Sequence, residues 1–152
     1  IISCDMPFLD PRVISFLEKK IKKEKKNVEG VTIHTKIDKK DAQNYNIAKI
    51  VLSKSNRILY LSRACIPNTK FSNKTTEYFS HHGLLILKKK ALQRYSSLKN
   101  TYLQKAEENE WLKFIENDFL IKSFFYKKIK PEINTRGDLK KYFPYKFKLS
   151  NK

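Results

Sequence analysis

Residues 49–67 read KIVLSKSNRILYLSRACIP, and the other elements can be placed around them. Two runs rich in aliphatic, β-branched and aromatic side chains, 50–52 and 58–61, flank the polar stretch 53–56. Strand-forming runs on either side of a short polar turn predict a β-hairpin. The second strand leads to Arg63, whose guanidinium can hold a carboxylate or phosphate through two parallel hydrogen bonds. Arg63 is therefore a candidate ligand-binding residue, and an arginine that only reaches water from a sheet edge is the alternative.

The size and composition of the chain predict one folded domain, or part of a larger one. It has 152 residues, of which 40% are hydrophobic, enough to fill a core. Its first residue is isoleucine, so the sequence is either processed or part of something longer. No apolar run is long enough for a signal peptide or a membrane span, which predicts a cytoplasmic protein without a membrane partner. Cys4 and Cys65 are not in a metal-binding spacing and are expected to be reduced thiols.

The net charge of +18 favours nucleic acid as the first candidate partner. However, the lysines are scattered as pairs and triplets along the whole chain and do not form one stripe. No platform of alternating basic and aromatic residues accompanies them, as single-stranded nucleic acid binding would require. Nucleic-acid binding therefore remains only an alternative function.

The periodicity of apolar residues predicts alternating helices and strands. Helices are expected at 11–26, 89–98 and 101–117 and after the capping box at Thr135, with a short helix or loop at 38–45. Strands are expected at the N-terminus, where 1–2 lead to Asp5, and at 31–37, 50–52, 58–61, 84–87 and 119–129. Residues 68–80 read as a long loop. This order predicts a three-layer α/β domain with a partly parallel sheet.

Three groups of polar residues could carry chemistry. Asp5 follows a strand, where a carboxylate can bind Mg²⁺ if a second carboxylate or phosphates complete the shell, although a simple turn aspartate fits too. His81 and His82 could present an imidazole to a ligand but are weak candidates for zinc. Glu107 and Glu110 fall on one helical stripe, where buried carboxylates must be hydrogen-bonded or face a polar ligand. The alternative is that both point to solvent.

Several short motifs follow one another in the order found in the CMP-Kdo synthetases, the 3-deoxy-manno-octulosonate (Kdo) cytidylyltransferases. They are Cys4 to Leu9, Asn44 to Asn46 leading into Lys49 to Leu52, Leu59 to Arg63 with Ile66 and Pro67, His81 to Gly83, Thr101 to Glu107, Leu112 to Asn117, and Ile133 to Leu139. Together they extend from Cys4 to about Tyr142. The chain resembles the C-terminal portion of that family, so an N-terminal portion is expected to be missing.

The resemblance implies a three-layer α/β/α, nucleotide-diphospho-sugar transferase-like (Rossmann-like) fold with a mixed sheet. Residues 1–152 would form a single incomplete cytidylyltransferase domain, the sugar-binding and dimerisation portion. The family transfers CMP from CTP to Kdo with Mg²⁺, releasing pyrophosphate, for lipopolysaccharide biosynthesis. The implied partners are thus CTP, Kdo, a second copy in a homodimer, and a separate N-terminal portion.

The resemblance also assigns roles to individual residues. Asp5 would be a metal ligand, and Asn134 falls where the family has its second metal aspartate. Arg63 would be the catalytic residue, and it would line the Kdo pocket together with Ser62 and His81. Glu110 would lie on the helix that contacts the sugar.

The chain departs from the family pattern at several of these positions. Cys4 stands where the family has glycine before the metal aspartate, and Asn134 lacks the charge of an aspartate. Trp111 replaces the glutamine after Glu110, and Leu85 replaces a tyrosine. These changes and the missing triphosphate-binding loop predict a truncated or inactive copy that makes no CMP-Kdo alone. A non-catalytic remnant is the related alternative.

Overall fold

A five-stranded mixed sheet forms the centre of the molecule in the computed structural model, which describes residues 1–70, 76–130 and 132–143. The strand order is β3-β2-β4-β1-β5, and only the β1–β5 pair is parallel. The strands are β1 (Gly30–Ile37), β2 (Lys49–Leu52), β3 (Ile58–Ser62), β4 (Tyr78–Leu87) and β5 (Ile121–Phe125). The helices are α1 (Pro11–Lys23), α2 (Lys39–Ala42), α3 (Lys89–Ser96), α4 (Tyr102–Ala106), α5 (Leu112–Glu116) and α6 (Arg136–Tyr142). The predicted mixed sheet is confirmed.

The predicted hairpin is formed by β2 and β3. Ile50 lies opposite Leu61, and the turn places Asn56 at φ 64°, a left-handed conformation that asparagine tolerates better than most residues. β2 also pairs with β4 through Lys49 and Ser80. This second pairing brings the end of β3 close to the histidines of β4.

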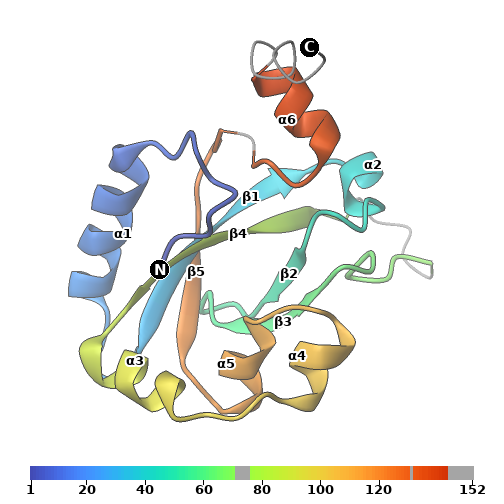
Figure 1. Cartoon of the computed structure of the whole chain (residues 1–152). Coiled ribbons are helices and arrows are strands. Elements are labelled where there is room, and N and C mark those ends of the chain that lie inside the picture. The colour runs from blue at the N-terminus through green and yellow to red at the C-terminus, as the bar shows by residue number, and fades with distance from the viewer. Residues whose placement is uncertain (71–75, 131, 144–152) are drawn as a thin grey trace.

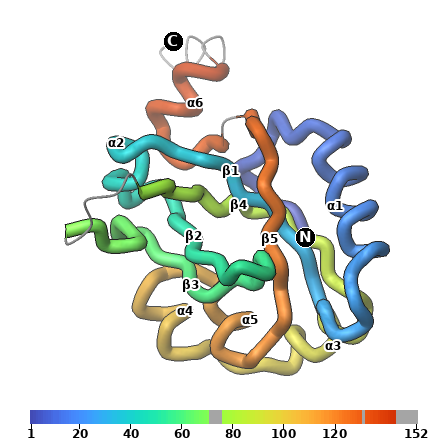
Figure 2. The backbone as a smooth tube through the Cα atoms, turned by 180° about the vertical axis from the view of Figure 1, so that it is seen from behind, coloured from blue at the N-terminus to red at the C-terminus, as the bar shows by residue number. Residues whose placement is uncertain are grey.

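Hydrophobic clusters cover both faces of the sheet, as a three-layer fold requires. Leu84 belongs to the cluster that contains Leu17 of α1, whereas Leu85 belongs to the cluster with Leu112 and Phe114 of α5. Neighbouring residues of a strand point to opposite faces, so α1 covers one face and α3 to α5 the other. Figures 1 and 2 show α1 on one side of the strands and α4 and α5 together on another, with α6 standing apart near α2.

Two strands differ from their prediction. The strand predicted at 31–37 is present as β1, but it lies between β4 and β5, so its first six residues are all buried despite their alternating polarity. β4 begins at Tyr78, inside the stretch predicted as a loop, so His81 to Gly83 lie within the strand and do not open it. Residues 71–75 of that predicted loop lie outside the described residues.

The prediction of one continuous helix at 101–117 is wrong, because this stretch forms two separate helices. α4 ends at Ala106 and α5 starts at Leu112, and Glu108 between them adopts φ 47°, which no helix can accommodate. The predicted helix at 89–98 is present as α3 and buries Ala91, whereas Leu92 is exposed.

The remaining differences concern strand ends. Residues 1–2 form only an isolated bridge, from Ile2 to Leu84, and β5 ends at Phe125 well before Ile129. Pro131 and Pro144, which follow the predicted last strand and last helix, lie outside the described residues.

Both predicted helix starts are confirmed. Asp10 caps α1 by accepting from the backbone N–H of Arg12, and Pro11 occupies the first turn. Thr135 and Asp138 form the capping box of α6. None of the helices in the described ranges is long and apolar enough to cross a membrane.

Candidate functional site

A cavity of about 210 Å³ brings together five of the six residues that the sequence marked as a site. It lies where the N-terminal segment, the end of β3, the middle of β4, the α4–α5 connection and residues 132–134 meet. The predicted residues that line it are Asp5, Arg63, His81, Glu110 and Asn134. These positions are spread over 130 residues of sequence, so only the fold could unite them.

Arg63 is half-buried at the cavity. One guanidinium nitrogen, Nη1, donates to the backbone carbonyl of Tyr45 at 3.1 Å. Within the described part of the chain no carboxylate forms an ion pair with Arg63. The guanidinium is thus placed to bind an anionic group that enters the cavity.

Ser62 is buried behind the cavity and does not line it. Its Oγ lies 2.8 and 2.9 Å from the two carboxylate oxygens of Glu107, and the backbone N–H of Arg63 donates to the same carboxylate at 3.1 Å. Glu107, at the C-cap of α4, is half-buried and hydrogen-bonded. The predicted buried stripe is wrong for Glu110, which is exposed and lies in the connection between α4 and α5, not on a helix. In this structure Ser62 and Glu107 hold the backbone at Arg63, and Ser62 has no direct contact with the cavity.

His81 presents an unpaired nitrogen to the cavity. The residue is 6% exposed, and its Nε2 is buried without a hydrogen-bond partner in the described structure. Its ring packs edge-on against Trp111, with ring centroids 4.1 Å apart. Burial, with smaller effects from His82 and His34, lowers the pKa of His81 to about 3. A neutral imidazole with an unmet nitrogen is suited to a hydroxyl or other neutral polar group.

Asp5 also has an unmet oxygen. Its Oδ1 is buried without a partner in the described structure. Burial first, and then the nearby charge of Glu132, raises the pKa of Asp5. The backbone is fixed on both sides, because Ser3 N donates to Gly83 O at 2.8 Å and Ile133 N donates to Asp5 O at 2.8 Å. A side chain added at Gly83 would come within 2.6 Å of the Ser3 Cβ, so this approach needs glycine.

Lys49, which was not among the predicted site residues, supports one wall of the cavity. Its side chain is fully buried, and Nζ donates to the carbonyls of Asn44 at 2.8 Å, Ile47 at 2.6 Å and Arg63. Burial lowers its pKa. Asn46 lines the cavity within the loop that these bonds fasten. A lysine at the start of β2 was the only available signal, and it does not reveal the carbonyls that surround the ammonium.

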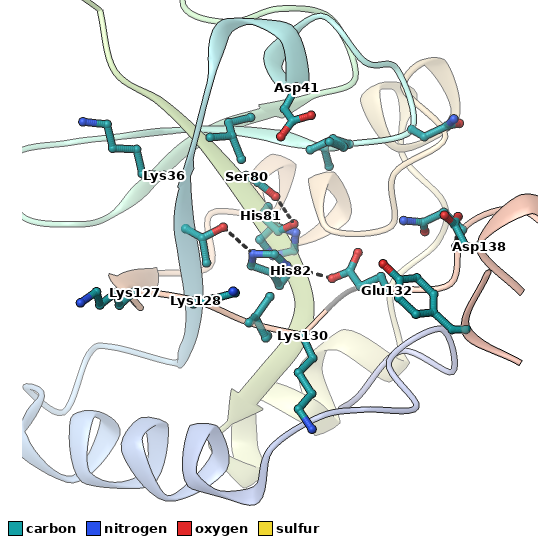
Figure 3. A pocket seen from close by; sticks show the side chains of 18 of the residues that line it. Lys36, Asp41, Ser80, His81, His82, Lys127, Lys128, Lys130, Glu132 and Asp138 are labelled. Atoms are coloured by element: carbon teal, nitrogen blue, oxygen red, sulfur yellow. Dashed lines mark hydrogen bonds and ion pairs between the residues drawn. The ribbon is translucent and has the colours of Figure 1, made fainter.

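A larger, lysine-rich cavity of about 560 Å³ adjoins the first and shares five lining residues with it, Asn46, Ala48, His81, Glu132 and Asn134. At its base, Thr35 Oγ1 lies 2.9 Å from His82 Nε2, and His82 Nδ1 lies 2.9 Å from Glu132 Oε1. Figure 3 shows His82 turned toward Glu132, with Lys127, Lys128 and Lys130 nearby. Glu132 thus faces both cavities.

Comparison with known proteins finds relatives of this chain, although no family model matches it. It is 31% identical over 137 residues to the 3-deoxy-manno-octulosonate cytidylyltransferase of Rickettsia rickettsii, covering 90% of this chain and 54% of that enzyme. It is 33% identical over 138 residues to the Elusimicrobium minutum enzyme of the same name, covering 89% of this chain and 56% of that enzyme. This chain is related to the 3-deoxy-manno-octulosonate cytidylyltransferases.

The chain spans about half the length of the curated cytidylyltransferases that it matches. A solved structure of CMP:2-keto-3-deoxy-manno-octonic acid synthetase, in complex with CTP, superimposes with a TM-score of 0.83. That match covers 95% of this chain and 59% of the other at 24% identity, and it confirms the cytidylyltransferase fold. The resemblance inferred from the ordered motifs is confirmed as well.

Proposed function

We propose that this chain is the sugar-binding part of a Kdo cytidylyltransferase and binds Kdo in the 210 Å³ cavity. The convergence of Arg63 and His81 on one cavity carries the proposal. Kdo is a sugar acid, so its carboxylate suits the guanidinium of Arg63 and its hydroxyls suit the unpaired Nε2 of His81. CTP would be the second substrate of the complete reaction, as the relatives' names imply.

The residues present also fit Mg²⁺. Mg²⁺ prefers oxygen ligands and commonly takes one or two carboxylates, with water and substrate phosphates in the other positions. Asp5 offers a buried oxygen without a partner, and Asn134 offers an amide oxygen beside the same cavity. When bound, the ion would neutralise charge on the phosphates of the nucleotide.

Kdo binding can be followed through Trp111, because it is the chain's single tryptophan and lines the cavity. Titration with Kdo is expected to change its fluorescence, and calorimetry should report the same affinity. In Arg63→Ala the affinity should fall by about 30-fold or more, since losing charge-assisted hydrogen bonds costs about 2 kcal/mol.

Arg57→Ala provides a matched control, because Arg57 is exposed directly after the turn of the same hairpin and lies outside the cavity. Its Kdo affinity should equal that of the unaltered chain. Equal affinities of Arg63→Ala and the unaltered chain would remove Arg63 from the sugar site.

We expect no release of pyrophosphate when this chain alone is mixed with CTP, Kdo and Mg²⁺. The described residues contain no glycine-rich loop to hold a triphosphate, and Asn134 contributes no charge. A coupled pyrophosphate assay measures this directly. Clear turnover would show that these residues suffice for catalysis.

A further inference from the structure

Residues 132–134 lie against Asp5, and this contact places a second carboxylate beside it. The hydrogen bond from Ile133 N to Asp5 O, 2.8 Å long, joins the two backbones. The residues on either side of Ile133 are Glu132 and Asn134, and both line the cavity that contains Asp5. The amide at 134 is neutral, but the carboxylate at 132 is not.

Glu132 is held in place from its far side. His82 Nδ1 contacts Glu132 Oε1 at 2.9 Å, and His82 Nε2 is fixed in turn by Thr35 Oγ1 at 2.9 Å (Figure 3). A histidine that carries its proton on Nδ1 satisfies both contacts, by donating to the carboxylate and accepting from the threonine. Chains of this kind orient carboxylates that bind metal ions.

Within the described ranges no lysine or arginine forms an ion pair with Asp5 or Glu132, although Lys127, Lys128 and Lys130 line the adjoining cavity. Lys49 and Arg63, the buried or half-buried cations nearby, donate to backbone carbonyls. Asp5 Oδ1 and the Nε2 of His81, a residue more than nine-tenths buried, both lack partners in the described structure and both belong to the cavity wall. Two carboxylates and unmet polar atoms around one cavity are what a divalent cation would satisfy.

We propose that Glu132 supplies the second carboxylate of a divalent-cation site with Asp5, in place of the charge that Asn134 lacks. This rests on the proposed function, which puts a cation at Asp5. No three His, Cys, Asp or Glu side chains gather as a metal cluster in the described ranges. The ion must therefore complete its shell with the Asn134 amide, water and substrate oxygens, as suits Mg²⁺ or Mn²⁺.

Binding of Mn²⁺ to the chain, measured by loss of the electron paramagnetic resonance signal of free Mn²⁺, tests the proposal without any turnover. In Glu132→Gln the affinity should fall by about tenfold or more, because the amide keeps an acceptor for His82 but removes the charge. Adding Asn134→Asp to this variant should restore binding, since it returns a carboxylate to the cavity. Glu77→Gln is the matched control, because Glu77 is exposed and pairs with Lys36.

Three outcomes would overturn the proposal. If Glu132→Gln binds Mn²⁺ as the unaltered chain does while Asp5→Asn loses it, Glu132 is not a ligand. If Glu77→Gln weakens binding as much as Glu132→Gln, the ion is held by general charge. If the unaltered chain binds no Mn²⁺, with or without Kdo, the cation site is absent, and the Arg63→Ala titration still decides the sugar site separately.

Discussion

Replacing Lys49 with methionine is expected to destabilise the protein by about 3 kcal/mol. The backbone carbonyls of Asn44, Ile47 and Arg63 would lose their shared donor in the interior, and each carbonyl left unpaired costs about 1–3 kcal/mol. Methionine has nearly the same length, so loss of packing contributes little. Part of the cost is offset because the variant no longer buries a charge. Urea unfolding measures the difference in the free energy of unfolding.

The same substitution should weaken Kdo binding, because Lys49 fastens both Arg63 and the loop around Asn46 to the cavity wall. Lys54→Met is the control, because Lys54 is exposed in the turn of the same hairpin. The free energy of unfolding of this variant should differ from that of the unaltered chain by less than about 0.5 kcal/mol. A Lys49→Met protein as stable as the unaltered chain would mean that the carbonyls find other partners or water.

Lowering the pH from 7.5 to 5 is expected to decrease the free energy of unfolding by about 4 kcal/mol. Two buried histidines, His34 and His81, each contribute about half of this decrease. Burial lowers the pKa of His34 to about 4 and that of His81 to about 3. In the unfolded chain both should titrate near the ordinary value of about 6.5. Below that pH both histidines bind a proton in the unfolded chain but not in the folded chain. The stability contributed by the neutral rings is therefore complete above pH 6.5 and is lost as the pH falls toward 4.

His34→Gln should remove about half of this pH dependence. His34 is buried, with its Nδ1 2.9 Å from Ser123 Oγ and its ring against Phe79, and it lies outside the sugar cavity. Urea unfolding at pH 7.5 and pH 5 gives, for each of the two proteins, the change in the free energy of unfolding between these pH values. Asp10 and Asp138 have lowered pKa values and contribute only at more acidic pH, and the raised pKa of Asp5 affects both proteins alike, so none of the three disturbs the comparison. If this change is the same in both proteins, His34 is protonated in the folded protein at pH 5.

The elements predicted correctly are those decided by contacts between neighbouring residues. The Asp10–Pro11 start of α1, the capping box of α6 and the turn between β2 and β3 each depend on a few consecutive side chains. The ordered motifs likewise identified the cytidylyltransferase relatives, because the order of residues along a chain needs no structure to be recognised.

The errors occurred where distant packing overrides local pattern. The strand predicted at 31–37 is present as β1, but its alternating sequence did not indicate that both of its faces are buried, which follows because β4 and β5 flank it and helices cover the sheet. The 101–117 stretch has a helical period, yet it bends at Glu108, and Glu107 reaches β3 from the end of α4. Ser62 consequently serves that contact and lies outside the cavity.

By itself the sequence determined the α/β class, the hairpin, the helix caps and five residues that line one cavity, since short-range chemistry and motif order encode them. The tertiary structure alone decided that Lys49 holds three carbonyls and that Glu132 lies beside Asp5. Both depend on hydrogen bonds to backbone groups whose positions exist only after the sheet and its loops have packed. The identity and spacing of side chains in the sequence therefore do not indicate these backbone partners.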